Sequence, residues 1–132
     1  ALKGRDGLSS PSVPALVAHI AAYRDGAPWL DALRDYLQAN MRYVADTLNN
    51  AFPALCWQPP EATYLAWIDL RPLNVDDRAL QQALIAEQKV AIMPGYTYGP
   101  EGNGFLRLNV GCPREKLERG VEGLIAALRS LS

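Results

Sequence analysis

The sequence predicts an α+β fold: a two-layer sandwich in which helices pack on a small, mainly antiparallel sheet, preceded by one long helix. Three observations support this prediction. Segments with helical and strand periodicity follow the order helix, long helix, strand, strand, helix, strand, strand, helix. Tight turns join the strands on one side and a helix joins them on the other. A chain of 132 residues has the length of one compact domain with a core of its own.

The first expected helix begins after Ser10 or Ser12, because either hydroxyl can accept a hydrogen bond from the first unpaired N–H groups. Its apolar side chains recur at helical spacing and are Val13, Leu16, Val17 and Ile20. We expect this helix to end near Gly26 in the left-handed conformation that glycine favours. A longer helix is expected from Pro28, which suits a first turn, to Phe52, which precedes a proline.

The long helix carries two apolar stripes that together cover more than half of its circumference. The first stripe is aliphatic and contains Leu30, Leu33, Leu37, Met41, Val44 and Leu48. The second is aromatic, with a spacing of seven residues, and contains Trp29, Tyr36 and Tyr43. A surface helix needs only one narrower stripe. The helix therefore either contacts two bodies, its own domain and a second one, or is buried in its own core, and the pattern leaves both interpretations open.

Four strands and two further helices are expected after the long helix. The strands are predicted at residues 55–57, 63–70, 89–93 and 105–110. Strand 63–70 is mostly apolar on both faces, so we expect it at the centre of the sheet. A helix at residues 77–87 is capped by Asn74 or Asp76. The last helix follows Pro113 and buries Leu117, Val121, Leu124, Ile125 and Leu128.

Composition and charge exclude several classes of protein. With 13 basic and 14 acidic side chains the net charge is -1, so we expect no direct binding to nucleic acid and none to an anionic membrane. The two cysteines, Cys56 and Cys112, are too few for a disulfide scaffold and lack neighbours at metal-ligand spacing. We therefore expect reduced thiols, a cytoplasmic protein and no metal site. The chain starts at Ala1 without a methionine or a signal-peptide core, and we expect a fragment of a longer protein.

Strand 105–110 is the most informative segment for function. Strand alternation turns Leu106, Leu108 and Val110 toward the core and places Arg107 and Asn109 on the opposite face. A guanidinium in the middle of a strand either reaches solvent, pairs with a surface acid or faces a bound anion, because an unpaired buried charge is too costly. Its planar fork matches a carboxylate with two parallel hydrogen bonds. From these residues alone, a solvated arginine or a surface ion pair remains an alternative to a binding site.

A glycine- and tyrosine-rich loop at residues 94–104 connects two of the expected strands. It is longer than a tight hairpin connection, and loops of this kind often form the rim of a site. Tyr96 and Tyr98 would present phenol groups there. No Gly-Lys-Ser/Thr ends the loop, so it is not a P-loop. An ordinary glycine-rich connection is the alternative interpretation.

Three segments, in this order, carry a resemblance to a known family. They read PEATYLAWID at 60–69, VAIMPGYTYG at 90–99 and GFLRLNVGCP at 104–113. Together they resemble the C-terminal part of fold-type I, class I/II pyridoxal-phosphate enzymes of the aminotransferase type. Within these enzymes the chain is most similar to the MalY/PatB subgroup of cystathionine β-lyases. The resemblance covers essentially the whole chain.

The resemblance implies roles for particular residues. Arg107 matches the family arginine that binds the α-carboxylate of the amino-acid substrate, and Tyr64 and Asn109 are placed with it on the substrate side. The loop near the cleft is represented by Pro94, Gly95, Tyr96 and Tyr98. Residues 27–132 would form the C-terminal small domain. Residues 1–26 would be the tail end of the large domain of the parent enzyme.

The resemblance also implies what this chain lacks. The lysine that holds pyridoxal 5'-phosphate in the family lies in the large domain in a Ser-x-x-Lys context. Lys3, Lys89 and Lys116 have no Ser or Thr three residues earlier. We therefore expect pyridoxal 5'-phosphate in the full-length parent, no cofactor bound to this chain alone, and no activity of this chain alone.

For the parent, the resemblance implies a carbon–sulfur β-lyase that converts L-amino acids such as cystathionine to pyruvate, ammonia and a thiol. A class I/II aminotransferase is the alternative reaction. A homodimer is expected for the parent, assembled mainly through the large domain. By analogy with one member of the subgroup, the chain could also serve as an interaction module that binds a transcription activator. A self-sufficient small-molecule-binding domain is the third hypothesis.

Overall fold

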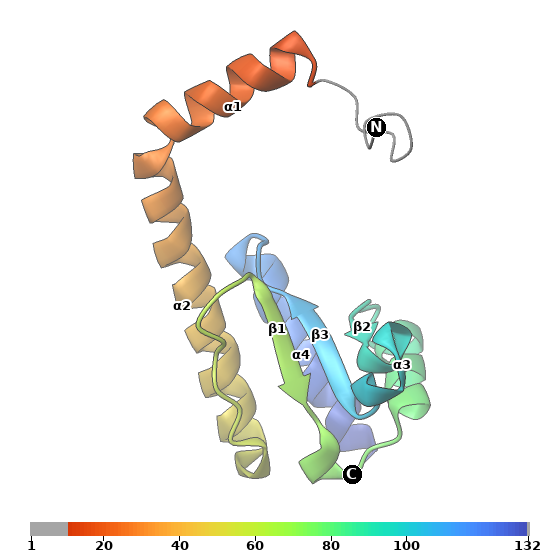
Figure 1. Ribbon diagram of the computed structural model, residues 1–132. Coiled ribbons are helices and arrows are strands. Elements are labelled where there is room, and N and C mark those ends of the chain that lie inside the picture. The colour runs from red at the N-terminus through yellow and green to blue at the C-terminus, as the bar shows by residue number, and fades with distance from the viewer. Residues whose placement is uncertain (1–10, 132) are drawn as a thin grey trace, which may run out of the picture. The chain divides into compact units, whose positions relative to one another are not determined.

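The computed structural model describes residues 11–131 and divides the chain into two units, residues 1–35 and 36–132. The helices are α1 (Val13–Asp25), α2 (Ala27–Ala51), α3 (Asp77–Ala86) and α4 (Arg114–Ser130), and the strands are β1 (Leu65–Asp69), β2 (Met93–Pro94) and β3 (Phe105–Asn109) (Figure 1). Within residues 11–131, no helix combines the length and apolar character that crossing a bilayer requires. The predicted α+β class is confirmed, with three strands in place of the expected four.

The first unit contains α1 and the beginning of α2. Ser12 is the N-cap of α1, and its hydroxyl accepts a hydrogen bond from the N–H of Ala15 at 3.4 Å. The predicted left-handed end at Gly26 is wrong, because Gly26 is right-handed with φ −83° and ψ −7°. Its N–H bonds to the carbonyl of Ala22, and its own carbonyl accepts from the N–H of Leu30. Helical hydrogen bonding therefore continues through this residue from one helix to the next.

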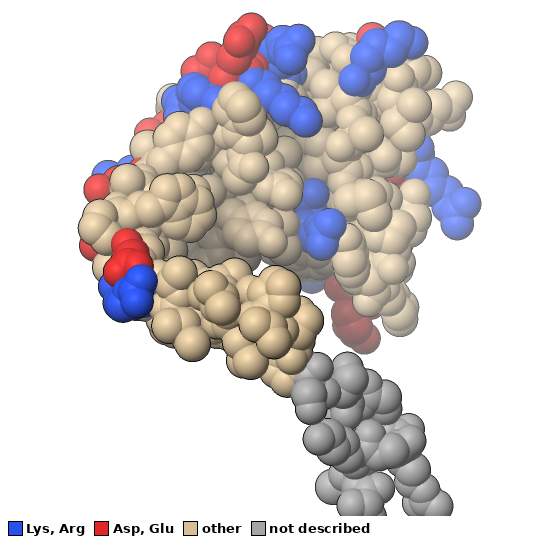
Figure 2. Space-filling view, turned by 90° about the horizontal axis from the view of Figure 1, so that it is seen from above, with Lys and Arg blue, Asp and Glu red and all other residues tan. Residues whose placement is uncertain are grey.

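The apolar stripe of α1 is exposed. No residue of α1 is buried, and Val13, Val17 and Ile20 each expose more than half of their surface. Figure 2 shows α1 as a surface of uncharged side chains with charged groups only at its C-terminal end. A helix of this composition is typical of one that contacts another part of a protein.

The second unit is built around the three-stranded sheet, whose order is β1-β3-β2 with both pairs antiparallel. The predicted central position of strand 63–70 is wrong, because β3 lies at the centre and β1 at the edge. On the outward face of β1, Trp67 contacts the aromatic rings of Tyr98 and Phe105, so a large apolar side chain on this face did not require a second neighbouring strand. Of the predicted strand 89–93, only Met93 joins the ladder, and the observed strand continues to Pro94.

The predicted strand 55–57 does not form. Residues Pro53–Leu55 make a 3-10 turn, and Cys56 follows in the left-handed region with φ 45°. The side-chain amide of Asn49 then pairs with the backbone of Trp57, donating to its carbonyl at 2.8 Å and accepting from its N–H at 2.9 Å. A side chain therefore supplies the partners that a neighbouring strand would have supplied.

The core lies between the sheet and the helices that cover one of its faces, with α4 running behind the strands (Figure 1). Leu106, Leu108 and Val110 are buried, which confirms the predicted inward face of β3. The helices contribute Met41, Val44 and Leu48 from α2, Leu80, Ala83 and Leu84 from α3, and Leu117, Val121, Leu124, Ala127 and Leu128 from α4. Of the last predicted stripe, Ile125 is only partly buried. The aliphatic stripe of α2 is thus buried in its own core from residue 41 onward, whereas Leu30 is exposed.

Two glycines of α4 allow a matched test of this packing. A Cβ on Gly123 would lie 2.8 Å from Cγ2 of Val90, whereas a Cβ on Gly120 would meet no atom within 4 Å. We expect Gly120→Ala to raise the free energy of unfolding by about 0.5–1 kcal/mol through helix propensity. Gly123→Ala should lower it by about 1 kcal/mol, because the stiff valine must move. Urea unfolding of both variants measures the two free energies. Equal stabilisation by the two substitutions would contradict the close packing of Gly123 against Val90.

Candidate functional site

The candidate site lies on the outward face of the sheet, opposite the core. The register aligns Trp67 of β1 and Met93 of β2 with Arg107 of β3, so these three residues form one row across the sheet. Because side chains alternate along a strand, Phe105 and Asn109 share this face with Arg107. The predicted outward direction of Arg107 is therefore confirmed.

Arg107 is half-buried and has a ring, not a carboxylate, as its partner. Its guanidinium carbon lies over the Tyr98 ring, 4.8 Å from the centroid. Among residues 11–131, the ion pairs involve four other arginines, and Arg107 belongs to none of them. The interpretation of Arg107 as one half of a surface ion pair is thus wrong for the described part of the chain. Its hydrogen-bonding fork is available to an anion.

A cavity of about 590 Å³ adjoins Arg107, between residues 88–93, the end of β3 and the first turns of α4. Its lining includes the basic side chains of Lys89, Lys116 and Arg119 in addition to Arg107, and no aspartate or glutamate. The surroundings of Arg107 are therefore electropositive, which favours a negatively charged ligand.

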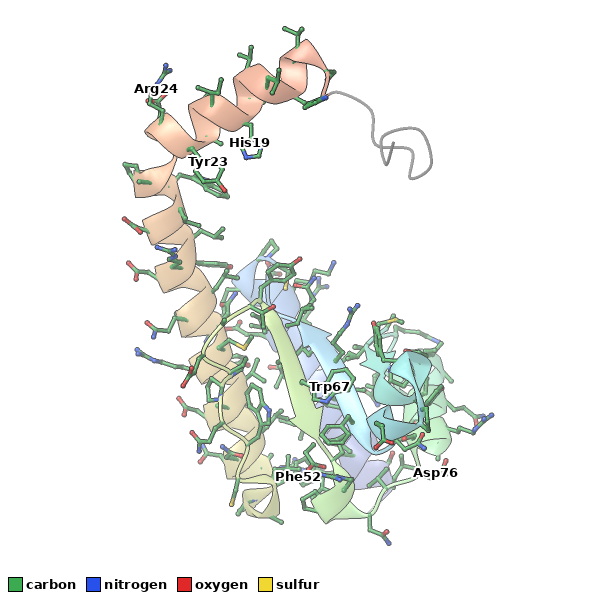
Figure 3. All side chains as sticks on the ribbon, viewed as in Figure 1. His19, Tyr23, Arg24, Phe52, Trp67 and Asp76 are labelled. Atoms are coloured by element: carbon green, nitrogen blue, oxygen red, sulfur yellow. The ribbon has the colours of Figure 1, made fainter. Side chains whose placement is uncertain are left out.

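The Tyr98 ring that contacts Arg107 belongs to a cluster of three aromatic rings on this face. The ring of Trp67 stacks on that of Phe105 at 5.7 Å and meets that of Tyr98 edge-on at 5.7 Å and 73°. The guanidinium of Arg71 covers the Phe105 ring at 4.6 Å. Figure 3 shows Trp67 over the strands, where 39% of its surface stays exposed. The sequence places Trp67 in a strand, but its part in this site depends on the pairing with Arg107 across β1 and β3 and could not be predicted from β1 alone.

The loop at residues 94–104 is folded into two 3-10 turns, Gly95–Tyr98 and Pro100–Gly102. The backbones of Gly95 and Gly102 approach so closely that a Cβ on either residue would overlap the other. The two tyrosines diverge, since the Tyr96 ring contacts Arg78 at 5.9 Å whereas the Tyr98 ring contacts Arg107. The structure thus brings Tyr98 to Arg107 and places Tyr96 beside α3.

Asn109 and Tyr64 lie at the end of the sheet beyond Arg107. The side-chain oxygen of Asn109 accepts a hydrogen bond from the N–H of Gly111 at 2.8 Å, so it stabilises the turn that follows β3. Tyr64 is half-exposed, and its carbonyl accepts from the N–H of Val110 at 2.9 Å. Tyr64 precedes β1, and a Cβ on Gly111 would lie 3.6 Å from its ring and 3.1 Å from the Asn109 side-chain oxygen. Their predicted role in substrate binding stays a prediction.

A buried amide positions the end of β3, and the sequence analysis missed it. Asn40 of α2 is 1% exposed, and its NH2 group donates to the carbonyl of Val110 at 2.9 Å and to that of Cys112 at 3.4 Å. Its oxygen accepts from Arg114 at 3.3 Å, and the Arg114 guanidinium lies 3.8 Å from the Tyr43 ring centroid. Asn40 thereby joins α2 to the strand that carries Arg107 and to the start of α4.

The Asp69–Arg71 pair sets the electrostatics at the opposite end of the face. Arg71 donates to both oxygens of Asp69, at 2.8 and 2.6 Å, and these hydrogen bonds lower the pKa of the Asp69 carboxyl. Because the folded pKa lies below the unfolded value of about 3.9, the pair stabilises the fold above that pH. This contribution is lost as the pH falls through the lowered pKa. It is small, since the Arg71 side chain is mostly exposed.

The remaining polar residues have structural partners. The His19 ring stacks on that of Tyr23 at 5.1 Å (Figure 3). Asp76 is the N-cap of α3, as predicted, and Asp77 accepts from the N–H of Gly104 at 2.7 Å. In the described part of the chain, no three His, Cys, Asp or Glu side chains form a group that could hold a metal ion.

Comparisons with known proteins place these features in a family. Residues 4–124 match the family model described as aminotransferase class I and II. The chain is 72% identical over 131 residues to protein MalY of Escherichia coli (strain K12), covering 99% of this chain and 34% of the relative. It is 40% identical over 124 residues to cystathionine beta-lyase PatB of Bacillus subtilis (strain 168), covering 94% and 32%.

Solved structures agree with this assignment. Cystalysin from Treponema denticola, whose crystal structure contains a pyridoxal 5'-phosphate cofactor, superimposes with a TM-score of 0.85 and 31% identity over 98% of this chain and 34% of that one. The chain spans about a third of the length of the curated relatives it matches. The match of the family model over residues 4–124 shows that the chain belongs to the class I and II aminotransferase family.

Proposed function

We propose that this chain is the C-terminal part of a pyridoxal-phosphate-dependent carbon–sulfur β-lyase of the cystathionine β-lyase type, in which Arg107 binds the α-carboxylate of the substrate. The observation that carries the proposal is the Arg107 guanidinium, which faces outward without an ion-pair partner among residues 11–131 and borders a cavity with no acidic lining. The names of the curated relatives, which include cystathionine beta-lyases, support the reaction type.

The domain organisation is part of the same proposal. Residues 27–132 would form the small domain and residues 1–26 the tail end of the large domain. The exposed apolar side chains of α1 support this division, because in the described chain they have no core of their own to enter. Trp29 and Leu30, at the start of α2, are likewise exposed. We infer that a large domain of the parent covers these side chains.

The residues described here do not fit pyridoxal 5'-phosphate by themselves. Of the two described lysines, Lys89 donates from Nζ to the carbonyl of Ala86 at 2.6 Å, and Lys116 is exposed on α4. Both lysines line the cavity beside Arg107, but no acidic residue lines it to meet a pyridinium nitrogen. We therefore propose that the rest of the parent holds the cofactor, and that this chain alone neither binds it nor is active.

The contribution of this chain is to bind and orient the substrate. The fork of Arg107 would form two parallel hydrogen bonds with the α-carboxylate. These bonds fix the substrate's orientation around its Cα, and holding a reactant in the right geometry removes much of the entropic part of the barrier. The half-buried position of Arg107 strengthens such bonds, because water competes less well there.

The full-length protein tests the proposal when it is purified with pyridoxal 5'-phosphate and given L-cystathionine. We expect pyruvate, ammonia and a free thiol in equal amounts. With 2-oxoglutarate added as the amino acceptor, formation of glutamate and of the oxo acid of cystathionine without thiol release would identify the alternative, an aminotransferase. Release of neither product would contradict the proposed class. The 132-residue chain, assayed in the same way, should release no pyruvate.

The proposal extends to the setting of the parent enzyme. The free state of Cys56 and Cys112 supports a cytoplasmic location, where thiols stay reduced. A homodimer is proposed for the parent. Binding of a transcription activator stays a prediction, since no feature of residues 11–131 identifies a surface for it.

A further inference from the structure

We propose that Tyr98 is the positioning residue of Arg107: its ring holds the guanidinium by one face and leaves the N–H groups at the edge for the substrate carboxylate. The inference rests on the proposed function, because it assigns the anion at Arg107 to an amino acid. The guanidinium carbon lies 4.8 Å from the centroid of the Tyr98 ring, within the range of a favourable cation–π contact.

A ring is a suitable partner for a ligand-binding arginine. The five N–H donors of a guanidinium point outward in its plane, and an acidic partner would occupy two of them. An aromatic ring instead interacts with the flat face, through which no N–H group donates. Tyr98 can therefore restrain Arg107 without competing with a carboxylate for its hydrogen bonds.

The Tyr98 ring is itself held in place from the sheet. Trp67 meets it edge-on at 5.7 Å and stacks on Phe105, while the indole N–H of Trp57 donates to the Trp67 carbonyl at 2.8 Å. On the loop side, the Thr97 hydroxyl donates to the carbonyl of Pro94 at 2.8 Å. An arginine side chain loses rotamer entropy when it binds a ligand, and a ring that restrains it beforehand reduces this loss.

Tyr98 contributes little to the core, which separates positioning from general stability. Half of its surface is exposed, and it lies outside the set of buried and partly buried residues that form the core. The pairing of β2 with β3 also explains why Tyr98 reaches Arg107. Met93 of β2 pairs with Arg107, and Tyr98 follows Met93 by five residues in the loop.

The experiment compares Tyr98→Leu with Tyr98→Phe in the full-length holoenzyme. L-norvaline, which lacks a leaving group, and butylamine, the same molecule without its carboxylate, are titrated by calorimetry, and KM and kcat are measured with L-cystathionine. Loss of the cation–π contact should weaken norvaline binding and raise KM by about 3- to 10-fold. Butylamine binding should not change. The Tyr98→Phe enzyme keeps the ring face and should bind norvaline as tightly as the unmodified enzyme.

A double-mutant cycle with Arg107→Ala completes the test, because Tyr98 is proposed to act only through Arg107. In the Arg107→Ala background, Tyr98→Leu should have no further effect on norvaline binding. Equal losses for norvaline and butylamine, additive effects in the cycle, or no difference between leucine and phenylalanine would each overturn the inference. If Tyr98→Leu fails to fold, judged by its melting temperature, Tyr98→Gln replaces it.

The same measurements separate this inference from the proposed function. If Arg107→Ala leaves the preference for norvaline over butylamine intact, the assignment of Arg107 to the carboxylate is wrong. If Arg107→Ala abolishes that preference and Tyr98→Leu leaves it unchanged, only the role of Tyr98 is wrong.

Discussion

Replacing Arg107 with lysine in the full-length enzyme is expected to lower kcat/KM for L-cystathionine about 10- to 100-fold. An ammonium group keeps the positive charge but cannot form the two parallel hydrogen bonds of the guanidinium fork. A hydrogen bond to a charged group contributes about 1.5–3 kcal/mol, and each 1.36 kcal/mol corresponds to a tenfold change in rate. A steady-state assay of pyruvate release measures the effect.

Arg42→Lys is the matched control for this prediction. Arg42 is exposed on α2, far in sequence from the loop and strand of the site, and the same change of chemistry there should alter kcat/KM less than about twofold. If Arg107→Lys behaves like Arg42→Lys, Arg107 does not bind the substrate carboxylate. Near-identical melting temperatures of the two variants would exclude a folding defect as the cause.

Replacing Asn40 with leucine is expected to lower the free energy of unfolding of the chain by about 2–3 kcal/mol. The change leaves the buried carbonyl of Val110 without its donor, and a buried unsatisfied group costs about 1–3 kcal/mol. The Cys112 carbonyl keeps the hydroxyl of Tyr36 as a donor at 3.0 Å, which limits the loss. Arg114 loses its contact with the Asn40 oxygen as well. Chemical denaturation followed by circular dichroism measures the difference.

Asn50→Leu, on the exposed side of the same helix, provides the comparison. Asn50 is exposed in the last turn of α2 and has no buried partner to lose among the described residues, so this change should shift the free energy of unfolding by less than about 0.5 kcal/mol. An equal effect of the two substitutions would mean that the Asn40 hydrogen bonds add nothing beyond the intrinsic preference of the helix.

The sequence predicted best the parts of the fold that depend on local periodicity and on residues that begin or end a helix. Helix α3 begins after its Asp76 cap, and α2 ends two residues before Pro53, because both signals act within one turn of the helix. The alternation of β3 predicted the direction of Arg107 for the same reason, since a side chain's face follows from its place in the strand.

The features that the sequence did not predict depend on distant partners. Residues 55–57 have strand composition, but the amide of Asn49 pairs with Trp57 and replaces a neighbouring strand. The edge position of β1 follows from which strands pair, and this information is absent from the composition of β1 itself. Gly26 is right-handed because α2 begins immediately after it, whereas a glycine that ends a helix before a loop is usually left-handed.

The candidate site divides in the same way. Strand alternation was enough to place Arg107 on the outward face. Its assignment to a substrate carboxylate, like the place of the loop near the cleft, came from the family resemblance and stays a prediction. Trp67 could not be assigned to the site, because its contact with Tyr98 depends on the register between β1 and β3 and on the fold of the loop. Asn40 lies about 70 residues from its acceptor Val110 in the chain, and a polar residue on an otherwise apolar stripe gives no indication of such a partner.

The two margins of the sheet are each protected from association with other chains. At β1, the Trp57 indole already occupies the carbonyl of Trp67, which a foreign strand would otherwise use. At β2, Pro94 has no N–H group to offer. A three-stranded sheet normally presents two open margins that can template aggregation, and here one residue at each margin removes a hydrogen-bonding group. The sheet can therefore expose its aromatic face to solvent without also inviting edge-to-edge polymerisation.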